Sequence, residues 1–183
     1  MKLGVVMERV AIGVASVALA VGLIAILSGY FSSRDQPGVS GGAGGPGQSF
    51  VDLGHAHLQP GQPAPAYDSD PPTSGAHLPV AVPADGRRLS DNQLLEALEL
   101  GDVVIMYGTP APPPGLAALA HAVAGPFTPA LAASGQSVIL ARRPGTAGLI
   151  GLAWTHMVRV SAADDPLLRE FSQFWVGKGA PGH

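Results

Sequence analysis

Histidines in the first half of the chain are the residues whose type and spacing could support chemistry. His55 and His57 flank Ala56, so both imidazole rings point the same way if this segment is extended, and His77 follows in a second loop-like segment. Imidazole nitrogen is a ligand for zinc, copper, nickel and iron, and three histidines can hold one such ion. The spacing is not diagnostic. We therefore favour histidines that only form hydrogen bonds with loop backbone or face water, with a metal site at His55, His57 and His77 as the alternative.

Other candidates for chemistry give weaker signals. Glu96 and Glu99 lie three residues apart on a predicted helix and are therefore neighbours in space. They could form a functional carboxylate pair, but solvated charges on the helix surface are the interpretation that we favour. The sequence contains no Walker and no His-Glu-x-x-His motif. The Gly-x-Ser-x-Gly pattern at residues 38–42 and the Gly-x-Gly-x-x-Gly pattern at residues 42–47 and 177–182 lie in Gly-rich stretches without the strand before and helix after that each motif requires. We therefore expect no catalytic residues, no cofactor and no enzymatic activity.

The composition narrows the class of protein. The chain has 183 residues, a formal net charge of −3, 13% charged residues and no cysteine, with a mean hydropathy of +0.28 and a pI near 6.0. The length fits one domain with an appendage, and the low charge content with the positive hydropathy indicates a membrane segment. The absence of cysteine excludes disulfides and thiolate metal sites. Because no basic run is present, we expect no binding of nucleic acid.

An uncharged apolar stretch near the N-terminus is the predicted membrane segment. Residues 10–31 carry no charged side chain, and as a helix they would be roughly 33 Å long, enough to cross a hydrocarbon core of ~30 Å. The stretch is longer than the apolar part of a secretory signal peptide, so we expect an uncleaved anchor. Lys2 and Arg9 precede it, whereas Arg34 beside Asp35 follows it. The positive-inside rule then predicts a cytoplasmic N-terminus and an extracytoplasmic main domain.

Small residues form one stripe along the predicted span. They recur at alternating spacings of four and three residues, which places them on one face of a helix. In lipid, such a face lets a second helix approach closely and gain packing contacts. We therefore expect the lipid-embedded helix to pack against other transmembrane helices through Ala11, Ala15, Ala18, Gly22, Ala25 and Gly29.

The elements that must position the histidines lie in the predicted extracytoplasmic domain at residues 50–183. Residues 32–49 are rich in Gly and Pro and are predicted to form a linker after the anchor at residues 1–31. Ser90 and Gln93 predict a capped helix that ends at Gly101. Two further helices are predicted at residues 116–123 and 166–175. Strands are predicted at residues 103–107 and 137–141 and across the broad region 149–160. The expected fold class is α+β, with a small sheet that we expect to be antiparallel.

Two motifs carry a resemblance to a known family. Residues 67–77 read Tyr-Asp-Ser-Asp-Pro-Pro-Thr-Ser-Gly-Ala-His, which resembles the Tyr-x-x-x-Pro-Pro-Thr-Ser-Gly-Pro-His signature of the bacterial domain of unknown function 3105 (DUF3105) family. Residues 95–105 look like that family's Val-His-Asn-Leu-Glu-His-Gly-Gly-Val-Val-Ile, and the resemblance covers residues 52–176. It implies a membrane anchor, a low-complexity linker and an extracytoplasmic domain. No activity is implied.

The departures from the family pattern guide the expected function. Both histidines of the family's His-x-Leu-Glu-His-Gly segment are replaced, by Glu96 and Leu100, while His57 and His77 match the family's other two. This chain keeps the family's sequence pattern but lacks two of its four histidines. We therefore expect a scaffold and not an enzyme. A third interpretation, an extracytoplasmic enzyme of unrecognised type, has no supporting residue spacing.

We therefore expect a non-catalytic, single-pass accessory subunit of a larger complex in the bacterial inner membrane. Its periplasmic domain would brace the extracytoplasmic surfaces of partner proteins. Energy-transducing assemblies, either photosynthetic reaction-centre–antenna complexes or respiratory ones, are common hosts of such subunits. The alternative is a periplasmic metal-binding protein that uses His55, His57 and His77, with Glu96 as a fourth ligand.

Overall fold

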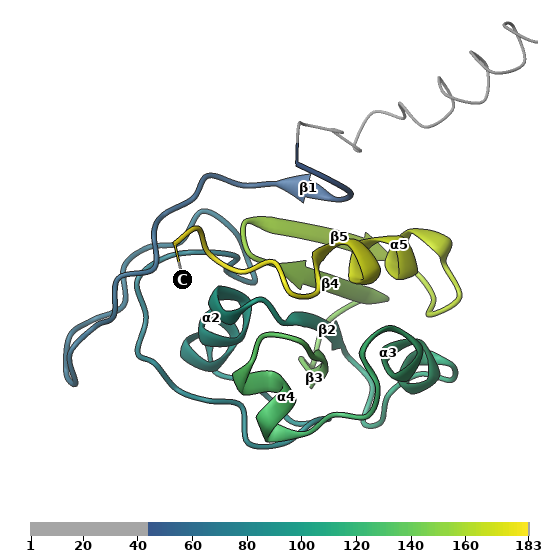
Figure 1. The fold of residues 1–183 in the computed structure, drawn as a ribbon. Coiled ribbons are helices and arrows are strands. Elements are labelled where there is room, and N and C mark those ends of the chain that lie inside the picture. The colour runs from purple at the N-terminus through teal and green to yellow at the C-terminus, as the bar shows by residue number, and fades with distance from the viewer. Residues whose placement is uncertain (1–43, 183) are drawn as a thin grey trace, which may run out of the picture. The chain divides into compact units, whose positions relative to one another are not determined.

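The computed structural model describes residues 44–182. The predicted anchor at residues 1–31, its stripe of small residues and residues 32–43 of the predicted linker lie outside this part of the chain. Among the described residues, no helix is both long enough and apolar enough to cross a membrane. The fold described below concerns the domain alone (Figure 1).

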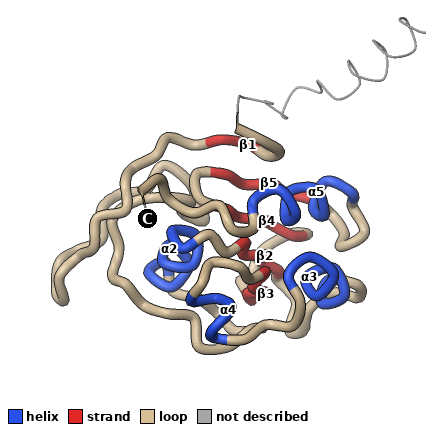
Figure 2. The backbone as a smooth tube through the Cα atoms, viewed as in Figure 1, coloured by secondary structure: helices blue, strands red, loops and turns tan. Residues whose placement is uncertain are grey.

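A five-stranded mixed sheet forms the centre of the domain, with its strands side by side in Figure 2. The antiparallel arrangement that we expected is wrong for one pair, because β2 and β3 run parallel. Helices α3 (Leu116–Ala124) and α4 (Pro129–Ala133) connect these two strands, and a long crossover of this kind is what a parallel pair requires. The other neighbours are antiparallel. The order across the sheet is β1 (Gln48–Ser49), β5 (His156–Val160), β4 (Leu149–Ala153), β2 (Val103–Tyr107) and β3 (Val138–Arg142).

Helices cover both faces of the sheet, which confirms the α+β class. Helices α2 (Asp91–Leu100) and α4 lie on one side, and α3 and α5 (Pro166–Trp175) lie on the other (Figure 1). Alternate residues of β2 point to opposite faces, as the two-residue period of a strand requires. Val104 and Met106 pack into the cluster under α2, while Val103, Ile105 and Tyr107 pack into the cluster under α3 and α5.

Helix α2 begins and ends where the sequence predicts. The Ser90 side chain accepts a hydrogen bond from the Gln93 backbone, and the Gln93 side chain accepts one in return from the Ser90 backbone. Gly101 ends the helix in the left-handed conformation, with φ of 115°, which costs glycine little. These two signals fix the helix that carries Glu96 and Glu99.

The segment between β1 and α2 has no regular helix or strand, and backbone hydrogen bonds order it. The Leu58 N–H donates to the His77 carbonyl at 2.8 Å, and the His77 N–H donates to the Ala56 carbonyl at 3.2 Å. The Gly75 N–H donates to the Gly54 carbonyl at 2.9 Å. His57 and His77 thus lie directly opposite each other in an isolated parallel bridge.

Residues 44–49, which we assigned from the sequence to the linker, belong to the folded domain. Gln48 and Ser49 pair with β5, and the Trp175 indole donates a hydrogen bond to the Pro46 carbonyl at 2.8 Å. Composition alone suggested a flexible tether, but the glycines here allow close packing instead. Gly47 has φ of +99°, and a Cβ at this position would lie 2.8 Å from Phe171 Cε2 and 2.9 Å from the Met157 carbonyl oxygen.

Replacing Gly47 tests this packing. Gly61 is the matched control, because its φ of +89° is similar but no atom lies within 4 Å of the added Cβ. Gly61→Ala should lower the free energy of unfolding by about 1–2 kcal/mol, the cost of a left-handed alanine. Gly47→Ala should lower it by a further 1–3 kcal/mol or so because of the steric overlap. Urea denaturation of both variants measures the difference, and equal losses would show that residues 44–49 do not pack as described.

A buried carboxyl group lies immediately after α2. Asp102 is only 1% exposed, and its Oδ1 accepts a hydrogen bond from the Ser137 N–H at 2.7 Å. Neither Asp102 Oδ2 nor the buried Ser137 hydroxyl has a hydrogen-bond partner among the described residues. Burial raises the pKa of the Asp102 carboxyl from 3.8 to about 7, against the lowering effect of the Ser137 hydrogen bond. Folding therefore favours the protonated acid.

The stability of the domain should depend on pH through Asp102. Between pH 4 and 7 or so the unfolded chain has released this proton while the folded chain still holds it, so the free energy of unfolding falls as the pH rises. The fall should reach up to about 4 kcal/mol. The Asn side chain of Asp102→Asn cannot ionise and keeps an oxygen for the Ser137 N–H, so this variant should not show the fall. At pH 8 it should unfold at a higher urea concentration than the wild type. Parallel pH profiles for the two proteins would contradict the assignment.

Candidate metal centre

Four side chains from two parts of the chain converge beside α2. His57 and His77 come from the paired irregular segments, and Glu96 and Glu99 come from α2. One donor atom from each of these residues lies within 4.8 Å of the other three. Glu96 and Glu99 share this side of the helix because three residues make nearly one turn. The fold thus collects two imidazoles and two carboxylates at one point.

The distances between the donor atoms suit one small metal ion. Glu99 Oε2 lies 3.2 Å from His77 Nε2 and 3.4 Å from His57 Nε2. Glu96 Oε2 lies 3.5 Å from His77 Nε2 and 4.0 Å from His57 Nε2. A tetrahedral ion with bonds of about 2.0–2.1 Å holds its ligand atoms about 3.3–3.4 Å apart. Most of these separations need only small adjustments to reach that value.

The two nitrogens of the fully buried His77 ring have different roles. Nδ1 lies 2.9 Å from the Gly75 carbonyl oxygen, and because a carbonyl can only accept, Nδ1 carries the proton in this contact. Nε2 faces Glu96 and Glu99 but has no hydrogen-bond partner among the described residues. When Nε2 carries no proton, its lone pair is directed at the two carboxylates, and a cation between these atoms would relieve the repulsion. The same arrangement is typical of metal-bound histidine, whose second nitrogen donates to a backbone carbonyl.

The carboxylates of this cluster are withdrawn from water. Glu99 is 2% exposed and Glu96 is 17% exposed, so our interpretation of these residues as solvated helix charges is wrong for Glu99. The helix turns this face toward the segments that carry His57 and His77 and not toward solvent. Placing two carboxylates side by side in such a site costs several kcal/mol unless a positive charge compensates them. A divalent cation would neutralise both.

The three predicted histidines occupy different places. His57 and His77 lie in the four-donor cluster, and so does Glu96, the expected fourth ligand. His55 lies just outside it, with Nδ1 3.2 Å from Glu99 Oε1 and its ring edge-on to Trp154 at 6.3 Å between centroids. Sequence reasoning missed Glu99 as a ligand, although its spacing from Glu96 was the signal that pairs them. Metal binding itself stays a prediction.

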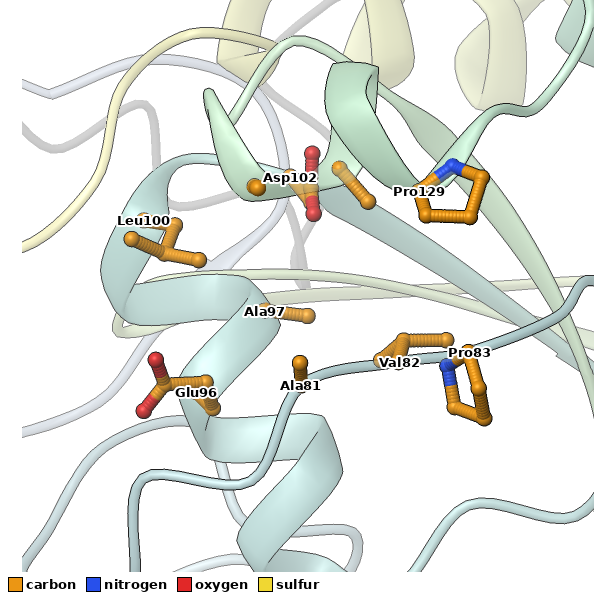
Figure 3. Close-up of a pocket in the computed structure, with 10 residues that line it drawn as sticks. Ala81, Val82, Pro83, Glu96, Ala97, Leu100, Asp102 and Pro129 are labelled. Carbon is orange, nitrogen blue, oxygen red and sulfur yellow. The ribbon is translucent and has the colours of Figure 1, made fainter.

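Leu100, the second replaced position of the family pattern, contributes to an apolar surface. It lines a pocket of about 120 Å³ between α2, α4 and the segment before α2. Figure 3 shows the Glu96 carboxylate directed away from Val82 and Pro83, so the charged end of Glu96 and the apolar part of the pocket lie on different sides of the helix. Of the two replacements, Glu96 alone supplies a donor to the cluster.

Comparisons with known proteins identify a family and nothing narrower. Comparisons with curated proteins and with solved structures found no significant match. The model of a family described as a protein of unknown function, DUF3105, matches residues 57–182. This range includes His57, His77, Glu96 and Glu99, and it covers well over half of the chain. The chain therefore belongs to the DUF3105 family.

Proposed function

We propose that this domain binds one divalent first-row transition-metal ion through His57, His77, Glu96 and Glu99. The observation that carries the proposal is the orientation of His77. Its Nδ1 is engaged by the Gly75 carbonyl, while its Nε2 faces the Glu96 and Glu99 carboxylates without a hydrogen bond. A cation among these atoms would accept the Nε2 lone pair and neutralise both carboxylates.

The donor types restrict the kind of ion. Two imidazole nitrogens and two carboxylate oxygens suit Zn²⁺ and Cu²⁺, whereas Ca²⁺ and Mg²⁺ prefer sites built from oxygen alone. Cu⁺ prefers thiolate and thioether ligands, and neither kind belongs to the cluster. The near-tetrahedral separations favour Zn²⁺.

The number of donors supports binding over catalysis. A catalytic zinc site usually has three protein ligands and keeps the fourth position for water or substrate, whereas a closed site has four protein ligands. Here the four donors would fill the tetrahedron. His57 is nevertheless 45% exposed, so an ion held here could be reached from solvent and exchanged. We infer a metal-binding protein that stores or delivers its ion.

Titration of the metal-free full-length chain with Zn²⁺ tests the proposal. Calorimetry should give one ion per chain. Glu96→Gln keeps the shape of the side chain but removes its charge, and it should weaken binding by at least about tenfold, as should His57→Ala. Glu170→Gln, at an exposed position of α5, is the matched control and should bind as the wild type does. The absence of stoichiometric binding, or equal affinity of Glu96→Gln and the wild type, would overturn the proposal.

A second proposal is the accessory role in a membrane complex that the sequence suggests, and it is compatible with a bound metal. The supporting observation is a pair of exposed apolar residues on the segment after β1, Val51 at 69% and Leu53 at 42%. Contiguous exposed apolar patches mark contact surfaces, whereas single exposed apolar residues are common, so the proposal assigns Val51 and Leu53 to one such patch. In this proposal the surface that includes Val51 and Leu53 faces a partner protein.

Purification of the tagged full-length protein in mild detergent tests the accessory role. We expect it to co-migrate with a larger assembly, and Val51→Asp should reduce the recovered partners because it places a charge in an apolar contact. The variant must keep the thermal stability of the wild type, which is expected for so exposed a position. Recovery of the wild type as a lone chain would defeat this proposal and leave the metal site unaffected.

A further inference from the structure

We propose that His55 Nδ1 and Glu99 Oε1 form an outer metal subsite, which receives the ion from solvent and passes it to the four-donor centre. This inference rests on the metal-binding function proposed above. It assigns separate roles to the two oxygens of Glu99 and a kinetic role to a histidine outside the four-donor cluster.

The Glu99 carboxylate faces two groups of ligands at once. Its Oε2 lies within 3.4 Å of both inner histidine nitrogens, and its Oε1 lies 3.2 Å from His55 Nδ1. The outer nitrogen–oxygen separation equals the shortest separation in the inner cluster. It therefore also suits two ligands of one transition-metal ion. One carboxylate thus connects two adjacent positions for the same kind of ion.

The most exposed donors lie on the His55–His57 stretch. His77 and Glu99 are 0% and 2% exposed, whereas His55 and His57 are 39% and 45% exposed. An ion that arrives from solvent therefore meets the two histidines that flank Ala56 before it reaches the buried donors. The Ala56 carbonyl accepts the His77 N–H, which ties the short His55–His57 stretch to the inner ligand.

The transfer is a ligand substitution without change of oxidation state. His55 Nδ1 and Glu99 Oε1 each replace one water molecule of the hydrated ion. In the second stage, His57, His77, Glu96 and Glu99 Oε2 replace the remaining waters and His55, and the ion leaves the outer subsite. Two protein donors hold an ion only weakly, so the outer state is short-lived and the inner centre determines the affinity.

A relay of this kind predicts a specific pattern in the rates. An intermediate that lies on the path speeds both entry and exit, and its loss slows both by the same factor because the equilibrium between the end states is unchanged. A residue that merely holds Glu99 in place behaves differently. Its loss weakens the inner site and therefore speeds dissociation.

Stopped-flow measurement of Cu²⁺ binding to the metal-free full-length chain distinguishes these roles. Quenching of tryptophan fluorescence reports the ion, since Trp154 lies beside His55. His55→Ala should slow association and dissociation each by about tenfold and leave the dissociation constant within about threefold of the wild type. His121→Ala, which removes an exposed histidine of α3, is the matched control and should change neither rate.

The other outcomes separate the two proposals. If the wild type binds no Cu²⁺ and no Zn²⁺, the proposed function itself fails. If the wild type binds one ion and His55→Ala leaves both rates unchanged, the outer subsite alone is wrong. Faster dissociation with unchanged association in His55→Ala would also overturn it and would make His55 a positioning residue for Glu99.

Discussion

The backbone pairing between residues 54–58 and 75–77 is the constraint on which the candidate site depends. Hydrogen bonds between Leu58 and His77 and between His77 and Ala56 hold two segments that have no helix or strand of their own. This pairing places His57 opposite His77, and both rings then meet the carboxylates of α2. The site thus joins three stretches of chain that are distant in sequence, namely residues 54–58, residues 75–77 and α2. Backbone hydrogen bonds hold the first two stretches in place.

Local signals in the sequence predicted the elements that they control. The Ser90 and Gln93 capping box, the end of α2 at Gly101 and the buried strand Val103–Tyr107 depend on residues close together in the chain, and the structure confirms all three. The parallel pairing of β2 with β3 depends on how α3 and α4 cross the sheet, which no local pattern encodes. The burial of Glu99 likewise depends on a segment forty residues away or so, so its role could not be predicted from helical spacing alone.

The replacement of a family histidine by Glu96 takes on a different meaning once the geometry is known. From the sequence, the replacement of two of the four family histidines suggested that half of the polar centre had been lost. In the structure Glu96 contributes a carboxylate to the cluster, so this replacement exchanges one donor for another. In the proposed metal site, an anionic ligand in place of a neutral one would increase the attraction for a dication and shift the preference toward harder ions. Only the change to Leu100 removes a polar group altogether.

The hydrogen bond between Trp175 and Pro46, together with the short pairing of β1 with β5, has a mechanical consequence. Any tension applied to the chain at residue 44 is borne first by this clamp on the edge of the sheet and on α5. The path from there to His55 and His57 runs through Phe50, whose N–H is anchored to the Thr155 carbonyl. The clamp therefore separates His55 and His57 of the candidate site from strain at the N-terminal end of the domain.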